Sequence, residues 1–146
     1  MKLTSADFRD GELLNPQFTC DGQGVSPHLG WSDVPSGTQS FALRCFDPDA
    51  PGVGFVHWLA ANIPAAERQI PRGGRLPATA VEVENDFGKT AYGGPCPPSG
   101  VHRYEFTLYA LDAPRLDGLT SGNFLDFVKQ HTITATTLMC RYQRKH

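Results

Sequence analysis

Turn-forming residues interrupt this chain at short intervals, and this punctuation limits the possible folds more than any other feature. The 146 residues include 15 Gly and 12 Pro, whereas the two types together average about 12% of a protein. The glycines and prolines follow no repeat. Such a pattern is typical of a β-rich protein with many ordered loops and disfavours a helical bundle. The length suits one domain over residues 1–146, because single cores serve chains of about 100–200 residues.

Between the turns, two-residue alternation of side chains predicts strands. The predicted strands cover residues 40–47, 55–63, 80–85, 101–111 and 132–143, although residues 135–139 would also suit a helix. Residues 123–131 carry apolar side chains at helical spacing, which predicts one short amphipathic helix. Turn signals mark residues 8–30, 70–77 and 87–100 as loops. The predicted fold class is therefore all-β, a sandwich or barrel with a helix near the C-terminus.

The charge balance argues against two large classes of partner. Lys and Arg number 13 against 15 Asp and Glu, a net charge of −2, which offers no basic surface to nucleic acid or to an anionic membrane. The N-terminus has no apolar segment of signal-peptide length. The longest uncharged stretch, between Asp49 and Glu67, is broken by Pro51 and Pro64 and does not suit a membrane span. We therefore expect a cytoplasmic protein that crosses no membrane.

The four cysteines, Cys20, Cys45, Cys96 and Cys140, lie far apart and form no C-x-x-C pair. Cysteines of cytoplasmic proteins are usually reduced, so we expect free thiols. Three of them are expected to be buried as small apolar side chains.

An acidic segment follows the predicted strand at residues 40–47. Alternation directs Asp47 inward with Phe41 and Cys45, and an inward carboxylate costs several kcal/mol unless it is paired or hydrogen-bonded. The alternative is a turn in which Asp47 and Asp49 accept backbone N–H bonds while the neighbouring prolines fix φ. Both interpretations stand for this segment.

Two more strands carry ionisable side chains on apolar faces. His57 is predicted on the face that Leu59 and Ala61 share, where a lone histidine is more often a satisfied core residue than a functional one. His102 and Tyr104 point to one side, roughly 6.6 Å apart along their strand. Together with the two aspartates, these groups indicate one shared concave site, with the Gly- and Pro-rich loop before His102 as its rim.

Five strings of residues are distinctive in combination: TCDGQGVSPHLGW, DPDAP, VHWLAANIP, NDFG and YGGPCPPSGVHRY. In this order they resemble the phosphatidylethanolamine-binding protein family, and most closely its bacterial Raf-kinase-inhibitor-like branch. The similarity runs from about residue 8 to residue 142. It implies a large central antiparallel sheet packed on a smaller one, with a small pocket near the surface. In the family that pocket takes phosphate-like anions, phospholipid headgroups included, and needs no metal or cofactor.

Carried over position by position, the resemblance predicts a ligand-binding set without catalytic residues: Asp47, Asp49, Pro51, His57, Gly94, Pro95, Cys96, His102 and Tyr104. The sequence departs from the family pattern in two places. Residues 52–55 are short and lack a tryptophan, and His28 stands where a proline is usual. Because a phosphate needs donors, we expect the carboxylates to favour imidazolium and to fix its tautomer, so that a ring N–H points into the pocket. The hydroxyl of Tyr104 and backbone N–H groups of the rim are expected to supply further donors.

Three other interpretations compete with anion binding. Two His and two Asp could hold a metal, but the spacing lacks an H-x-H or H-E-x-x-H element. A hydrolase could use Asp47 with Asp49 as acid and base, or Cys96 with His57 or His102 as nucleophile and base. The resemblance also allows a kinase or protease partner and a homodimer. We favour non-enzymatic binding of a small anion or phospholipid headgroup, with a regulatory role towards partner proteins as an additional expectation.

Overall fold

The computed structural model describes residues 1–144, in which the chain forms two antiparallel sheets. The larger sheet has five strands in the order β6–β4–β3–β7–β8. These strands are β3 (Ser40–Asp47), β4 (Phe55–Pro64), β6 (Val81–Val83), β7 (His102–Leu111) and β8 (Thr132–Tyr142). The smaller sheet, in the order β1–β2–β5, consists of β1 (Lys2–Thr4), β2 (Leu29–Ser32) and β5 (Gln69–Ile70). The helices are a 3-10 turn (Pro16–Phe18) and α1 (Phe124–His131).

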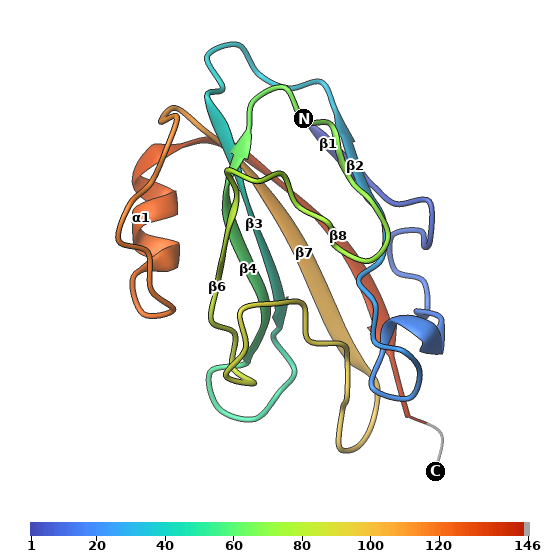
Figure 1. Cartoon of the computed structure of the whole chain (residues 1–146). Helices are drawn as coiled ribbons and strands as arrows, with labels where there is room; N and C mark the ends of the chain where they lie inside the picture. Colours follow the sequence, from blue (N-terminus) through green and yellow to red (C-terminus); the bar gives the residue numbers. More distant parts are fainter. Residues whose placement is uncertain (145–146) are drawn as a thin grey trace.

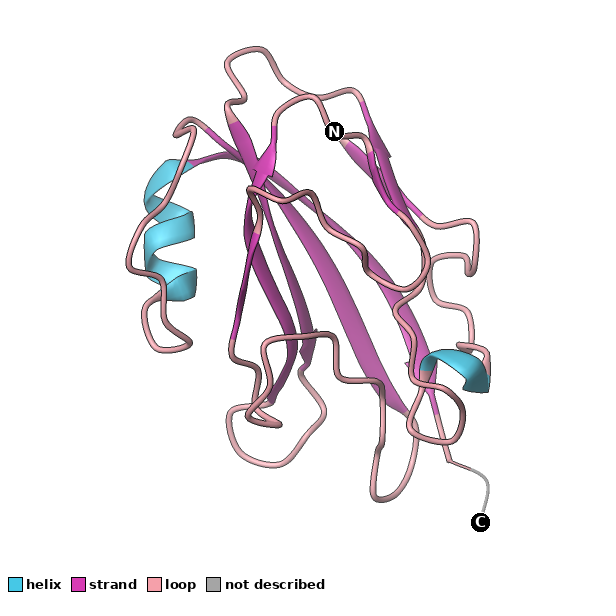
Figure 2. Ribbon diagram, viewed as in Figure 1, coloured by secondary structure: helices cyan, strands magenta, loops and turns pink. Residues whose placement is uncertain are grey.

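These elements form three layers. In Figures 1 and 2, α1 covers one face of the large sheet, and the small sheet lies over the other face. The larger apolar core, which includes Trp31, Phe41 and Trp58, lies between the two sheets. A second cluster, which includes Leu59 and Val128, lies between the large sheet and α1. Both faces of the large sheet are therefore buried, which explains why β4 is apolar on both sides.

The long elements confirm the sequence prediction: an all-β fold with a large sheet packed on a smaller one and one short helix near the C-terminus. Residues 132–142 form a strand and not a helix. The alternation pattern does not predict β1, β2 or β5, because runs of two to four residues are too short to show a period. Residues 145–146 of the predicted domain lie outside the described part. No helix within residues 1–144 is long and apolar enough to cross a membrane.

An irregularity in the pairing of β3 with β4 changes the position of His57. The register shifts there, so that His57 has no partner residue in β3. Beyond it, Leu59 and Ala61 pack in the cluster beneath α1, whereas the His57 ring contacts Tyr104 on the opposite face. The prediction that His57 shares a face with Leu59 and Ala61 is wrong, because alternation fails at a bulge.

The topology brings three strand ends together. Because β3 runs antiparallel to both β4 and β7, its last residues lie beside the first residues of its two neighbours. Asp47 pairs with Phe55 at the start of β4, and Phe46 pairs with Glu105 near the start of β7. The loops at this end, residues 48–54 and 84–101, surround the junction. The polar side chains that the sequence analysis singled out on β3, β4 and β7 thus lie at the same end of these three strands.

Candidate functional site

A cavity of about 170 Å³ opens at this junction. Its lining consists of Asp47, Ala50, Pro51, Phe55, His57, Phe87, Cys96, Pro97, Pro98, His102 and Tyr104. A larger hollow of about 460 Å³ lies between β6 and residues 115–121, and its one lining cation, Arg115, is paired with Asp117. We place the functional site in the smaller cavity, because an apolar wall with a few convergent polar groups is typical of ligand sites.

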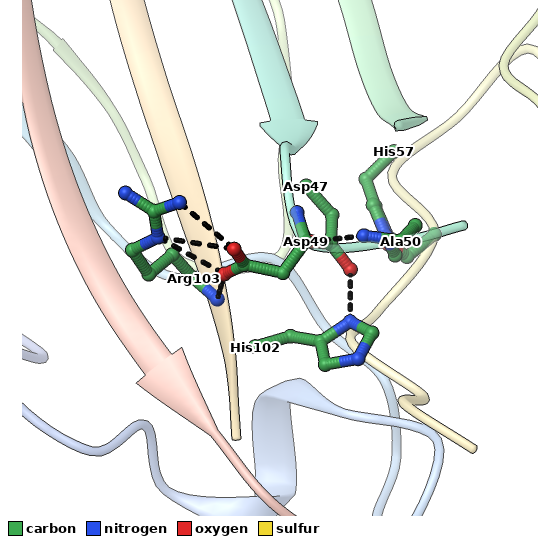
Figure 3. Close-up of polar contacts among 7 residues, drawn as sticks. Asp47, Asp49, Ala50, His57, His102 and Arg103 are labelled. Carbon is green, nitrogen blue, oxygen red and sulfur yellow. Dashed lines mark hydrogen bonds and ion pairs between the residues drawn. The ribbon is translucent and has the colours of Figure 1, made fainter. Parts of the chain in front are cut away.

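Asp47 is the most constrained polar group of the cavity, since only 3% of its surface is exposed. Its Oδ1 accepts hydrogen bonds from the backbone N–H groups of Asp49 (2.7 Å) and Ala50 (3.1 Å). Its Oδ2 accepts a hydrogen bond from His102 Nδ1 at 2.6 Å, as Figure 3 shows. Both interpretations of this segment therefore hold at once. One carboxylate oxygen stabilises the turn, while the other fixes the tautomer of His102, whose Nε2 has no hydrogen-bond partner among residues 1–144.

His57 is held by the loop on the other side of the cavity. Its Nδ1 donates to the carbonyl of Gly93 at 2.6 Å, and the Gly93 N–H donates to the His57 carbonyl at 2.9 Å. The buried amide of Asn85 adds a bond from its Nδ2 to the same His57 carbonyl. Burial, as the largest cause, lowers the pKa of His57, although the bond to Gly93 and the nearby Asp47 oppose this shift. His57 therefore favours the neutral form, with its proton on Nδ1.

Aromatic rings form the cavity wall. The His57 ring meets Tyr104 edge-on at 5.1 Å between centroids, and Phe55 and Phe87 pack at 4.7 Å. The Tyr104 hydroxyl is buried and has no hydrogen-bond partner among the described residues. Burial, followed by the charge of Asp47, raises the pKa of Tyr104. The hydroxyl therefore stays protonated and is a donor without a partner in a residue that lines the cavity.

Asp49 does not line the cavity. It reaches towards Arg103, away from His57 (Figure 3). Arg103 donates from its guanidinium at 2.8 and 3.0 Å and from its backbone N–H at 2.7 Å. The Arg103 side chain lowers the pKa of Asp49 to about 2, with a smaller opposing contribution from desolvation. Asp49 thus fastens the turn after β3 to β7, and the sequence pattern gives no signal for this pair.

The rim loop is only partly as predicted. Cys96 lines the cavity, but Gly94 and Pro95 lie behind it, against residues 18–20. The Cys20 N–H donates to the Pro95 carbonyl at 3.1 Å. A Cβ on Gly94 would come within 2.8 Å of the Phe18 carbonyl oxygen, so only glycine fits there.

Cys20 and Cys96 form a disulfide, which overturns two expectations. The prediction that all four thiols are reduced is wrong, and only Cys45 and Cys140 are free, both buried. Cys96 is not an available nucleophile, so the cysteine hydrolase loses its reactive group. The pairing depends on the approach of two loops that are 76 residues apart in sequence, which no local pattern shows. Structural disulfides are typical of oxidising environments, and the cellular compartment stays a prediction.

The remaining candidates take structural positions. His28 accepts a hydrogen bond from the Ala6 N–H at Nδ1 and bonds the Gln69 side chain through Nε2, outside the cavity lining. The segment at residues 52–55 ends in Phe55, which supplies an aromatic wall in place of the missing tryptophan. Phe87, which lies in the NDFG string, also lines the cavity and is absent from the predicted set. Within residues 1–144 no group of three or more His, Cys, Asp or Glu could hold a metal ion.

Comparisons with known proteins agree with this architecture. The family model described as phosphatidylethanolamine-binding protein matches residues 4–143. A UPF0098 protein of Methanothermobacter thermautotrophicus is 42% identical over 99% of both chains, and the UPF0098 protein YbhB of Escherichia coli is 46% identical over 80% of this chain and 82% of its own. The crystal structure of E. coli YbcL, described as a new member of the mammalian PEBP family, matches 99% of this chain and 98% of its own, with a TM-score of 0.93 and 34% identity. The chain belongs to the phosphatidylethanolamine-binding protein family.

Proposed function

We propose that this protein binds small phosphate-like anions in the 170 Å³ cavity and does not transform them. The observation that carries the proposal is the Asp47–His102 pair. Asp47 holds the Nδ1 proton of His102 at 2.6 Å, so that Nε2 is the ring atom left for a guest. A phosphate oxygen needs a donor there, and Nε2 donates only when the imidazole is protonated. The adjacent carboxylate fixes the orientation of this ring, and Tyr104 contributes an O–H donor.

The expected affinity is weak and depends on pH. Protonated His102 donates through both ring nitrogens, to Asp47 and to the guest. A neutral ring whose proton is held on Nδ1 by Asp47 presents a lone pair to the anion instead, which repels it. The site also contains the negative charge of Asp47, which limits the net attraction. Free phosphate, phosphomonoesters and lipid headgroups share this chemistry at the phosphorus oxygens.

Isothermal titration with inorganic phosphate, from mildly acidic to mildly alkaline pH, tests the proposal. We expect affinity to fall as pH rises and His102→Gln to reduce that fall. His131→Gln is the matched control, because His131 also bonds an aspartate (Asp112, 2.9 Å) but lies on the surface away from the cavity. Wild-type affinity that stays constant with pH contradicts the imidazolium account, and the absence of any phosphate binding contradicts the proposed function.

The proposal covers binding alone because the cavity offers no activated nucleophile among the described residues. Cys96 is in a disulfide, and both oxygens of Asp47 are engaged in hydrogen bonds. Asp49, the second carboxylate of the hydrolase hypothesis, is paired with Arg103 outside the cavity. Turnover of a phosphomonoester that His102→Gln abolishes would contradict this conclusion.

A regulatory role towards a partner protein is the second candidate. Val53, Phe87 and Val101 are exposed by 96%, 44% and 44% in the loops around the cavity, which makes its surroundings unusually apolar. A kinase or protease that docks there would cover the cavity mouth. We expect Val53→Asp to weaken such a complex and bound phosphate to alter its affinity. A complex that is insensitive to both changes would use another surface.

A further inference from the structure

His57 presents a hydrogen-bond acceptor to the cavity. A backbone carbonyl can only accept, so the 2.6 Å contact with the Gly93 oxygen requires the proton on His57 Nδ1. The reciprocal bond from the Gly93 N–H fixes the ring against this loop. The neutral ring therefore carries a lone pair on Nε2.

This lone pair has no hydrogen-bond partner among residues 1–144. His57 is only 3% exposed and lines the cavity, and no side chain or backbone group within residues 1–144 donates to its Nε2. The lowered pKa of His57, caused mainly by burial, opposes protonation of this nitrogen. The donor to Nε2 must therefore come from the cavity, either from water or from a P–OH or other hydrogen-bearing group of a guest.

From this arrangement we propose that His57 makes the site select oxyanions that carry their own proton, namely inorganic phosphate and phosphomonoester monoanions, over sulfate and phosphodiesters. The inference rests on the proposed function and specifies its ligand class. The P–OH group of the favoured guest donates to His57 Nε2, while its unprotonated oxygens accept from Tyr104 and from protonated His102.

Oxyanions without a proton are expected to bind more weakly for two reasons. An unprotonated oxygen placed at His57 meets a lone pair and is repelled, and it displaces the water that can donate to Nε2 in the open cavity without replacing that hydrogen bond. Sites built to bond a hydrogen-bearing group discriminate strongly against analogues that lack it. The phosphate of an intact phospholipid is a diester without a P–OH group. The cavity therefore suits free phosphate or a monoester headgroup, such as phosphoethanolamine, and not the intact lipid.

The test compares oxyanions by isothermal titration at pH 6, where about half of a phosphomonoester carries its proton because the second pKa is about 6. The probes are inorganic phosphate, methyl phosphate, dimethyl phosphate and sulfate. Dimethyl phosphate matches the charge of the methyl phosphate monoanion without a P–OH, and sulfate has the size of phosphate with no proton. We expect phosphate and methyl phosphate to bind at least about tenfold tighter than the other two, as a hydrogen bond to a charged group allows.

His57→Gln is the decisive variant, because a rotated amide can donate to the guest. We expect it to accept sulfate and phosphate almost equally, whereas His102→Gln weakens both anions and keeps their ratio. Long-range ¹H–¹⁵N NMR of the wild type is an independent readout, with the His57 proton expected on Nδ1. Equal wild-type affinity for phosphate and sulfate, an Nε2–H tautomer, or a folded His57→Gln that keeps the preference would overturn the inference. If no oxyanion binds at all, the proposed function fails first.

Discussion

Replacing Asp47 with asparagine separates the two tasks of this carboxylate. The amide oxygen of Asp47→Asn can still accept from the backbone N–H groups of Asp49 and Ala50, at 2.7 and 3.1 Å in the wild type. The amide NH₂ then faces His102 Nδ1, where the wild type has an acceptor at 2.6 Å. Two donors cannot share that contact, so His102 must move its proton to Nε2.

The cost follows from the exchange of one hydrogen bond. A bond to a charged group contributes about 1.5–3 kcal/mol and a neutral one about 1 kcal/mol, so the variant should lose about 0.5–2 kcal/mol. For a chain near 150 residues this corresponds to a fall in Tm of about 1–8 °C. Differential scanning calorimetry measures the fall. Asp112→Asn, which disrupts the exposed bond to His131, is the control and should change Tm little.

The Asp47→Asn substitution should change both the affinity for phosphate and the way in which this affinity depends on pH. In Asp47→Asn His102 donates from Nε2 in both its neutral and its protonated form, so the dependence on pH should become weaker. In mildly acidic buffer the variant should bind phosphate at least as tightly as the wild type, because it lacks the negative charge of Asp47, which limits the attraction for an anion. In mildly alkaline buffer it should bind more tightly. Titration over this range compares the two pH profiles, and a variant that keeps the steep wild-type profile would refute the assigned tautomer.

Three further perturbations address the other supports of the site. Tyr104→Phe removes a hydroxyl that has no protein partner, so urea unfolding should change by less than about 0.5 kcal/mol while phosphate affinity falls. Arg103→Gln should destabilise the protein near neutral pH, because the low pKa of Asp49 makes this pair stabilising above the unfolded value of 3.8. The difference should vanish as pH falls through about 2, and unfolding that is equally affected at both extremes would exclude the ion pair as its cause. Reduction of the Cys20–Cys96 disulfide should cost about 2–4 kcal/mol and weaken phosphate binding, because Cys96 lines the cavity. Calorimetry with and without reductant measures the first effect, and unchanged phosphate affinity after reduction would show that the disulfide does not shape the cavity.

The sequence alone predicts the two site residues that lie on β7. His102 and Tyr104 are two residues apart on a long regular strand, where the side-chain period is two, and both line the cavity. Asp47 was accessible for the same reason at the end of β3. The sequence identifies His57 as a candidate site residue but predicts the wrong face of β4 for it. The reason is that the bulge depends on how β3 pairs with β4 and not on β4 alone.

Groups that face the site from loops were less accessible. Phe87 was visible only through the resemblance of the NDFG string, and the ring position depends on Asn85, which accepts from the Phe87 N–H at 2.9 Å. Arg103 and Asp49 are 54 residues apart. Nothing in either neighbourhood identifies the other, since a charged residue near a strand end is common in any sheet.

The amino-acid sequence alone determined the long strands, the C-terminal helix and the inward direction of Asp47, His102 and Tyr104. These features follow from apolar side chains that recur every two or about 3.6 residues, a pattern that each segment shows by itself. Only the tertiary structure decided which partners those groups meet: the Gly93 carbonyl for His57, Arg103 for Asp49 and Cys20 for Cys96. The reason is that strand register and loop approach are set by packing of the whole chain, so a contact across 36 or 76 residues has no signature at either end.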